Sequence, residues 1–118
     1  MASQVDFIAV PVMTTVLNPH QTFYARWTWH SLVTTRAKEN VVPIICADHP
    51  EREYANGVYT SGASCIADPT HRFNNEEGPY SQALKLMEPR KEGFIITQIT
   101  KESIYQYRMY RRDVGLLE

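Results

Sequence analysis

Hydrophobic and polar side chains alternate over long parts of this chain, and a period of two favours β-strands. Residues 5–17 are rich in Val, Ile, Phe and Thr and are apolar on both alternating faces, as expected of a strand covered on both sides. Pro11 lies in this stretch and has no backbone N–H, so we expect a bulge or a free sheet edge there. Residues 23–34 alternate between large apolar and polar side chains and predict a half-buried strand.

A helix is the alternative for the second stretch. Residues 18–21, Asn-Pro-His-Gln, have the composition of a type I turn, but Asn18 would also suit the cap of a helix that starts at Pro19. We prefer the strand because the Thr, Trp, Tyr, Phe and Val of residues 23–34 are poor helix formers. A polar turn over residues 36–40 would follow this strand.

The middle of the chain predicts two further strands. Residues 41–47 form a short apolar run, and Pro43 places it at an edge or an end of the sheet. Residues 58–67 are also β-prone, although Gly62 weakens the strand.

Short helices are predicted at two places. Residues 48–51, Asp-His-Pro-Glu, carry acids and a proline where a helix begins, and Asn56-Gly57 would end it. Residues 79–88 have the apolar spacing of an amphipathic helix of two or three turns. The residues 68–78 between these segments have a loop-like composition.

The C-terminal part carries two more candidate strands, residues 94–99 and 104–111. The second could instead be a helix, since Ser103 and Gln106 fit a capping box and Gly115 fits a C-cap, but its tyrosines favour the strand. Together these segments predict an α+β fold with a mainly antiparallel, curved sheet of five or six strands and one or two short helices.

The composition is that of a single globular domain over residues 1–118. The sequence is 43% hydrophobic and 21% charged, and a chain of this length can bury a core without disulfides. It has two cysteines and no cationic stretch before its first apolar run, so we expect a reducing compartment and a cytoplasmic location. We expect no membrane association, because the uncharged residues 7–25 are too polar to span a bilayer.

Residues 104–112 interleave tyrosines with arginines, the composition of a stacking platform for single-stranded nucleic acid. The formal charge of the chain is -1, and its basic residues are spread out, so no basic surface is indicated. Nucleic-acid binding is therefore only a second alternative.

Reactive side chains are concentrated in two segments. They are Cys46, Asp48, His49, Cys65, Asp68 and His71. If the strands that contain the cysteines are neighbours, both thiols could join His49 and His71 as zinc ligands. The spacing matches no known zinc motif, and buried cysteines with capping aspartates explain the same residues, so we expect no metal.

The same side chains suggest nucleophilic catalysis by Cys65. His71 or His49 would accept the thiol proton, and Asp68 would orient the imidazole ring. The sequence has no phosphate-binding glycine loop and no dinucleotide-binding motif, so we expect no cofactor. A small cysteine- and histidine-dependent hydrolase, or a metal-assisted enzyme, is the alternative function.

The polar face of residues 23–34 suggests a small-molecule site if the sheet curls around a cavity. The candidate ligand-binding residues are Arg26, Thr28, His30 and Trp29. Arg26 and His30 would hold a polar or anionic ligand. The β-prone segments also carry more apolar surface than one short helix can cover, which favours a homodimer or homotetramer. We therefore expect a self-associating binding module and not an enzyme.

Overall fold

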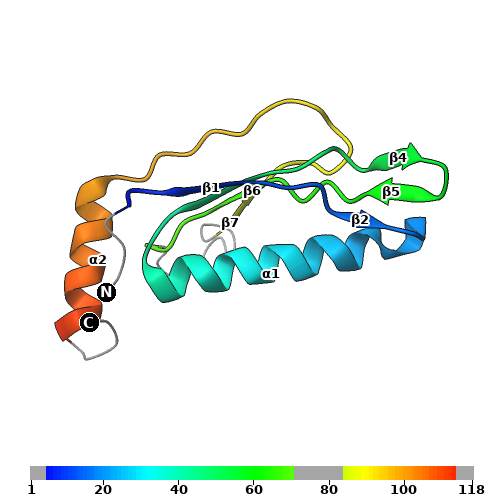
Figure 1. Cartoon of the computed structure of the whole chain (residues 1–118). Helices are drawn as coiled ribbons and strands as arrows, with labels where there is room; N and C mark the ends of the chain where they lie inside the picture. Colours follow the sequence, from blue (N-terminus) through cyan, green and yellow to red (C-terminus); the bar gives the residue numbers. More distant parts are fainter. Residues whose placement is uncertain (1–4, 71–83, 114–118) are drawn as a thin grey trace, which may run out of the picture.

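The computed structural model describes residues 5–70 and 84–113, which form an α+β fold (Figure 1). The larger sheet, sheet A, has the strand order β1-β3-β6-β7 and the smaller sheet, sheet B, the order β2-β5-β4. Sheet A consists of β1 (Ile8–Pro11), β3 (Ile44–Ala47), β6 (Cys65–Ala67) and β7 (Leu84–Leu86). Sheet B consists of β2 (Thr15–Val16), β5 (Val58–Thr60) and β4 (Arg52–Ala55). The helices are the 3-10 turn η1 (Pro19–Gln21), α1 (Thr22–Asn40) and α2 (Lys101–Asp113).

The predicted α+β class is confirmed, but the strands are arranged differently from the single curved sheet that we expected. The seven strands among the described residues belong to two sheets. β1 and β3 are parallel, while the other strand pairs are antiparallel. Parallel neighbours need a long crossover between them, and α1 forms part of that connection.

The strand predicted over residues 23–34 and the turn over 36–40 are wrong, because both stretches belong to α1. The helical alternative is confirmed at its start, where the Asn18 side chain accepts a hydrogen bond from the N–H of His20 and Pro19 opens η1. No glycine or proline interrupts α1. Packing against sheet A therefore overrides a β propensity that is weak per residue.

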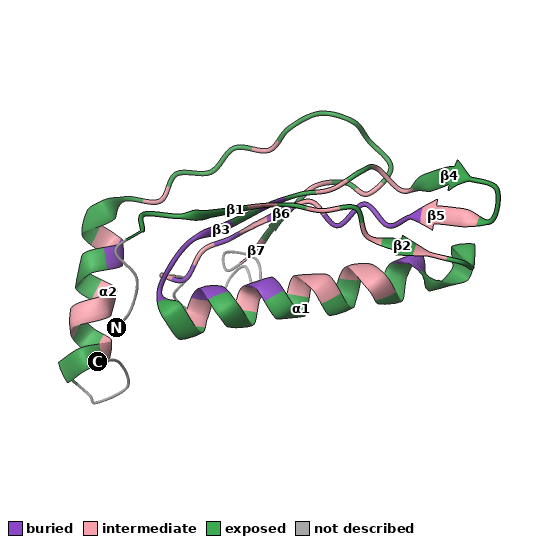
Figure 2. Ribbon diagram, viewed as in Figure 1, coloured by how far each residue is buried: buried purple, intermediate pink, exposed green. Residues whose placement is uncertain are grey.

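The core lies between α1 and one face of sheet A, where Figure 2 shows the buried positions of both. Its buried side chains are Val33, Ala37, Ile44, Cys46, Cys65 and Ala67. Trp29 and Val10 pack against this cluster from the helix and from β1. Within the described residues, the opposite face of sheet A has no helix lying across it (Figure 1).

The helix predicted to open at residues 48–51 is wrong, because β4 and β5 form an antiparallel hairpin instead. Asn56-Gly57 forms its turn, and Gly57 has a positive φ of 75°, which glycine adopts without steric cost. The strand predicted over residues 58–67 is divided into β5 and β6, which belong to different sheets. Gly62 lies at the break with a φ of 67°.

The helix predicted over residues 79–88 is wrong where the structure describes it, since Leu84–Leu86 is strand β7 and pairs with β6. Residues 79–83 lie outside the described residues, as does most of the predicted loop at 68–78. The strand predicted over residues 94–99 is also wrong, because this segment has no regular structure.

Residues 104–111 belong to α2, which confirms the helical alternative for this segment. The cap differs from the predicted one: the Oγ1 atom of Thr100 accepts a hydrogen bond of 3.1 Å from the N–H of Ser103. The predicted C-cap Gly115 lies outside the described residues.

The two strand prolines lie where their missing N–H is tolerated. Pro11 ends β1, an edge strand of sheet A, as expected. The N–H groups of Ile8 and Val12 donate toward β3, so the alternation of the strand directs the nitrogen of Pro11 away from β3. Pro43 directly precedes β3 and so marks an end of that strand, one of its two predicted positions.

The molecule is elongated, with principal extents of 52 × 33 × 22 Å and a radius of gyration of 15.7 Å. A compact domain of this length has a radius of gyration of about 13.5 Å. Among the described helices, none combines the length and the apolar character that crossing a bilayer requires. The elongation leaves much of each layer exposed to solvent.

We predict that Gly62→Ala lowers the free energy of unfolding by at least about 2 kcal/mol, because alanine is strained at this φ and its Cβ would lie 2.9 Å from Pro89 Cα and 3.0 Å from the Glu51 nitrogen. Gly57→Ala is the matched control. Its φ is also positive, but no atom lies within 4 Å of the added Cβ, so only the backbone cost of about 1 kcal/mol is expected. Urea unfolding measures both, and equal losses would contradict the close approach at Gly62.

Candidate functional site

The face of sheet A that points away from α1 is the open face, and an apolar row crosses it. The strand register places Ala9, Ile45 and Ile66 side by side in this row, and Lys85 of β7 lies next to Ile66 at its end. Neighbouring residues of a strand point to opposite faces, so the alternation that buries Cys46 under α1 leaves Ile45 38% exposed on the open face.

Residues 93–100, here called the strap, pass over the open face without regular structure (Figure 1). The Nζ atom of Lys85 donates a hydrogen bond of 2.7 Å to the carbonyl oxygen of Ile96. This bond tethers the strap to the apolar row that it crosses.

Two hollows, each of about 460 Å³, lie between the strap and the open face. Both are lined by Ile45 and Ile66, so they lie side by side over this pair, and we call the two hollows together the trough. The volume of each falls in the range of small-molecule sites, about 300–1,000 Å³.

The first end of the trough, the α2 hollow, is mostly apolar. Its apolar lining comes from Val5, Phe7, Pro43, Ile99, Ile104 and Tyr105. Lys101 forms an ion pair of 3.3 Å with Asp6, and Arg108 donates two hydrogen bonds, of 3.2 and 3.0 Å, to the carbonyl oxygen of Val41. Arg108 is therefore held by a backbone carbonyl, and the Lys101–Asp6 pair, although solvent-exposed, is shorter than the ion pairs at the other end.

The second end, the His49 hollow, has more polar groups. They belong to Asp48, His49, Arg52, Ser64, Lys91 and Glu92. Arg52 lies 3.9 Å from Glu92, and Lys91 lies 4.0 Å from Glu88, so both ion pairs are long and solvent-exposed. Such pairs contribute little, and an anion that enters this end can compete for both cations.

Asp48 fixes the geometry of this end. Its carboxylate accepts hydrogen bonds from the N–H and the hydroxyl of Thr14, from the N–H of His49 at 2.8 Å and from the N–H of Ala63 at 2.9 Å. Its own N–H donates to the hydroxyl of Ser64 at 2.8 Å. One side chain therefore joins the segments that follow β1 and β3 to the segment that precedes β6.

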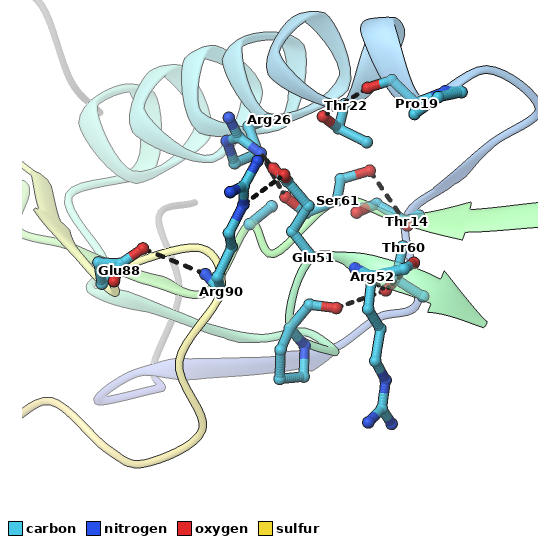
Figure 3. A network of polar contacts seen from close by, with 12 residues as sticks. Thr14, Pro19, Thr22, Arg26, Glu51, Arg52, Thr60, Ser61, Glu88 and Arg90 are labelled. Atoms are coloured by element: carbon cyan, nitrogen blue, oxygen red, sulfur yellow. Dashed lines mark hydrogen bonds and ion pairs between the residues drawn. The ribbon is translucent and has the colours of Figure 1, made fainter.

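A second polar network ties α1 to the base of the strap (Figure 3). Glu51 forms ion pairs with Arg26 of α1 and with Arg90, and Arg26 also donates to the Ser61 carbonyl oxygen at 2.9 Å. Burial disfavours the charged Glu51, but the hydrogen bonds and charges of Arg90 and Arg26 outweigh it and lower the pKa of the carboxyl. The N–H of Glu51 donates to Pro89, which precedes the strap.

Three of the four predicted ligand-binding residues lie on the inner side of α1. Arg26 contacts Glu51, the Nε2 of His30 donates to the Ala63 carbonyl at 3.2 Å, and the Nε1 of Trp29 donates to the Cys46 sulfur at 2.7 Å. Thr28 is exposed, and none of the four lines the trough. Their role in ligand binding stays a prediction.

The two cysteines lie directly opposite each other in β3 and β6, so the strands that contain them are neighbours, as the zinc hypothesis required. Both are buried, and neither forms a disulfide bond. A hydrogen bond from the Cys65 thiol lowers the pKa of Cys46, while the same bond and burial raise the pKa of Cys65. Among the described residues, no three Cys, His, Asp or Glu side chains gather as a metal ion would need.

Asp68 and His49, two other residues of the catalytic hypothesis, contact other groups than the two cysteines. The Asp68 carboxylate accepts hydrogen bonds from the N–H and the hydroxyl of Thr70, at 2.8 and 2.6 Å. His49 is exposed, with its ring beside that of Tyr54, and His71 lies outside the described residues. The catalytic hypothesis stays a prediction.

Sequence reasoning missed the trough and its cations, Arg52 and Lys91. A signal was present: Ile45 and Ile66 each lie next to a cysteine, so strands that bury the cysteines must turn these isoleucines to the other face. Comparisons of the chain with protein-family models, with curated proteins and with solved structures found no significant match.

We predict that Asp48→Ala lowers the free energy of unfolding by about 3 kcal/mol or more, because hydrogen bonds to charged groups contribute about 1.5–3 kcal/mol each and several donors would lose their acceptor. Asp68→Ala is the control, since within residues 5–70 and 84–113 that carboxylate accepts hydrogen bonds from its neighbour Thr70 and does not join distant segments as Asp48 does, and a loss of about 1 kcal/mol is expected. Urea unfolding measures both. Equal losses would show that Asp48 has no special role.

We predict a pH-dependent contribution of His30 to stability. Burial lowers the pKa of His30 below its ordinary value of 6.5, so below about pH 6.5 the unfolded chain binds more protons than the native one. This contribution is complete above that pH and is lost as the pH falls through it. In urea unfolding over a pH series, His30→Gln should remove this decline, while His20→Gln, at an exposed position, should retain it. A decline unchanged in His30→Gln would refute the assignment.

Proposed function

We propose that this chain is a binding module whose trough holds a small amphipathic anion. The apolar part of the ligand lies over Ile45 and Ile66, and its anionic group lies in the His49 hollow near Arg52 and Lys91. The observation that carries this proposal is the trough itself, an apolar floor shared by two hollows with loosely paired cations at one end.

The two ends of the trough favour one orientation of the ligand. In the α2 hollow, Lys101 and Arg108 are held by Asp6 and by the Val41 carbonyl oxygen. In the His49 hollow, the acid Asp48 is already bound by four donor groups, while the ion pairs of Arg52 and Lys91 are long. An anionic group therefore gains more at the His49 end.

The tether of the strap supports binding between the strap and the sheet. Within the described residues, the one hydrogen bond recorded between the strap and sheet A comes from the long side chain of Lys85. Few interactions hold the strap down, so it can adjust to a guest at low cost.

We predict that dodecanoate binds to the protein more tightly than dodecan-1-ol, by about ten-fold or 1.4 kcal/mol, because only the carboxylate gains the cations. The double variant Arg52→Ala, Lys91→Ala should bring the two affinities to within about a factor of two. Ile45→Glu should abolish the binding of both, because it places a charge on the apolar floor. Isothermal titration calorimetry below the micelle concentration measures these affinities.

Arg36→Ala is the matched control, because Arg36 is an exposed arginine of α1 paired with Glu39 and does not line the trough. It should leave both affinities unchanged. Circular dichroism checks that each variant is folded. Dodecanoate binding that survives in folded Ile45→Glu, or equal affinity of the native chain for the acid and the alcohol, would refute the proposed function.

A further inference from the structure

The face of α1 that points away from sheet A is a second unusual surface, separate from the trough. At its N-terminal half, Phe23, Tyr24 and Trp27 are 71%, 68% and 57% exposed, and Leu17 just before the helix is 80% exposed. The rings of Tyr24 and Trp27 lie 6.0 Å apart. Toward the C-terminal end the same face continues with Thr28, Ser31 and Thr35, while Phe23 and Leu32 lie at its two opposite flanks, since their separation along the helix amounts to about two and a half turns. We call these seven residues of α1 the outer stripe.

The outer stripe carries no charge. Between Phe23 and Thr35 the one charged residue is Arg26, and its side chain is turned inward to Glu51 and Ser61. A helix face that remains in water normally carries charged side chains. Depletion of charge together with Trp, Tyr and Phe is instead the composition of the centre of a protein interface.

The exposed area is large enough for a stable dimer. At about 200 Å² for each fully exposed ring system, the three aromatic side chains alone present about 400 Å². A standard interface buries about 800 Å² on each partner, and the rest of the outer stripe with Leu17 can supply the difference. The whole chain exposes 8038 Å², against about 6,600 Å² for a typical monomer of its mass.

We propose that a second copy of this chain docks on the outer stripe, with the two α1 helices packed antiparallel about a twofold axis. The large side chains occupy the N-terminal half of the stripe, and the small Thr28, Ser31 and Thr35 lie in the C-terminal half. Antiparallel packing places the rings of each copy over the small residues of the other, whereas parallel packing sets rings against rings. The interface is self-complementary and closed, as twofold symmetry requires.

A specific register follows from this packing. Tyr24 faces Thr35 of the second copy and Thr28 faces Ser31, while Trp27 and Leu32 lie on opposite flanks of the contact. Antiparallel helices also align their dipoles favourably. A membrane surface fits the stripe less well, because helices that lie on anionic lipid carry Lys and Arg along their apolar face. Apart from the inward-turned Arg26, the cations of α1 are Arg36 and Lys38, which lie beyond the C-terminal end of the stripe and contact Glu39 and the ring of Tyr107.

Sedimentation velocity at micromolar concentrations tests the proposal. The native chain should sediment as a dimer, and Trp27→Glu should raise the dimer dissociation constant by roughly a hundredfold, because it replaces a large ring that the second copy would bury with a charge. Phe94→Glu is the matched control: Phe94 is 82% exposed on the strap and outside the stripe, so its substitution should leave the dimer intact. Circular dichroism verifies the folding of both variants.

A distance measurement tests the orientation of the helices. Cys46 and Cys65 are buried, so a cysteine introduced by Glu39→Cys can be spin-labelled selectively. In the antiparallel register the two labelled Cα atoms lie roughly 30 Å apart, from 1.5 Å of rise per residue and about 9 Å between helix axes, whereas parallel helices bring them to roughly 10 Å. Thr28→Glu provides a second disruptive variant at an exposed position.

A monomer at all concentrations, a dimer that survives both Trp27→Glu and Thr28→Glu, or a dimer lost in Phe94→Glu would each overturn the proposal. Binding of the native monomer to anionic vesicles, abolished by Trp27→Glu, would assign the stripe to a membrane surface and overturn it as well. The label distance would overturn the antiparallel register if it matched the parallel value. None of these results depends on whether dodecanoate binds to the trough.

Discussion

The structure depends on one carboxylate that joins three segments far apart in the sequence. Asp48 accepts hydrogen bonds from Thr14, which follows β1, and from Ala63, which precedes β6, while it stands itself at the end of β3. For these bonds to form, β1 and β3 must end and β6 must begin at the same edge of sheet A. Asp48 thus fixes how sheet A meets the loops that lead to sheet B, and it shapes the His49 hollow. The ion pairs of Glu51 with Arg26 and Arg90 extend the same junction to α1 and to the base of the strap.

Sheet A and α1 each have one face that is covered by the other and one face that is not, and the uncovered faces are the open face of the sheet and the outer face of the helix. α1 covers one face of sheet A and leaves the other to a strap with few bonds to the sheet. The helix in turn has a covered inner face and an uncharged outer stripe. The trough and the outer stripe therefore lie on opposite sides of the same core. A ligand and a second chain could be accommodated together, because neither surface shares residues with the other.

Sequence patterns predicted the fold class, the β-strand character of residues 44–47 and the edge position of Pro11, because these depend on local apolar runs and on a missing N–H. They failed for α1, where Thr and aromatic residues favour strands and only packing on sheet A decides for a helix. An uninterrupted run without glycine or proline was the available counter-signal. The Asn56-Gly57 turn, typical of hairpins, was misread as the end of a helix. The trough could not be foreseen, since it depends on which strands are neighbours and on the path of the strap.

Pro11 at the edge of sheet A has a consequence for how the chain assembles. A strand edge with free N–H groups can pair with a strand of another molecule, and repeated pairing of this kind produces open-ended fibres. Because Pro11 offers no donor on the side away from β3, lateral growth of the sheet at this edge is disfavoured. At this edge, addition of a strand from another molecule is therefore disfavoured, whereas a contact through the surface of a helix does not require a free strand edge.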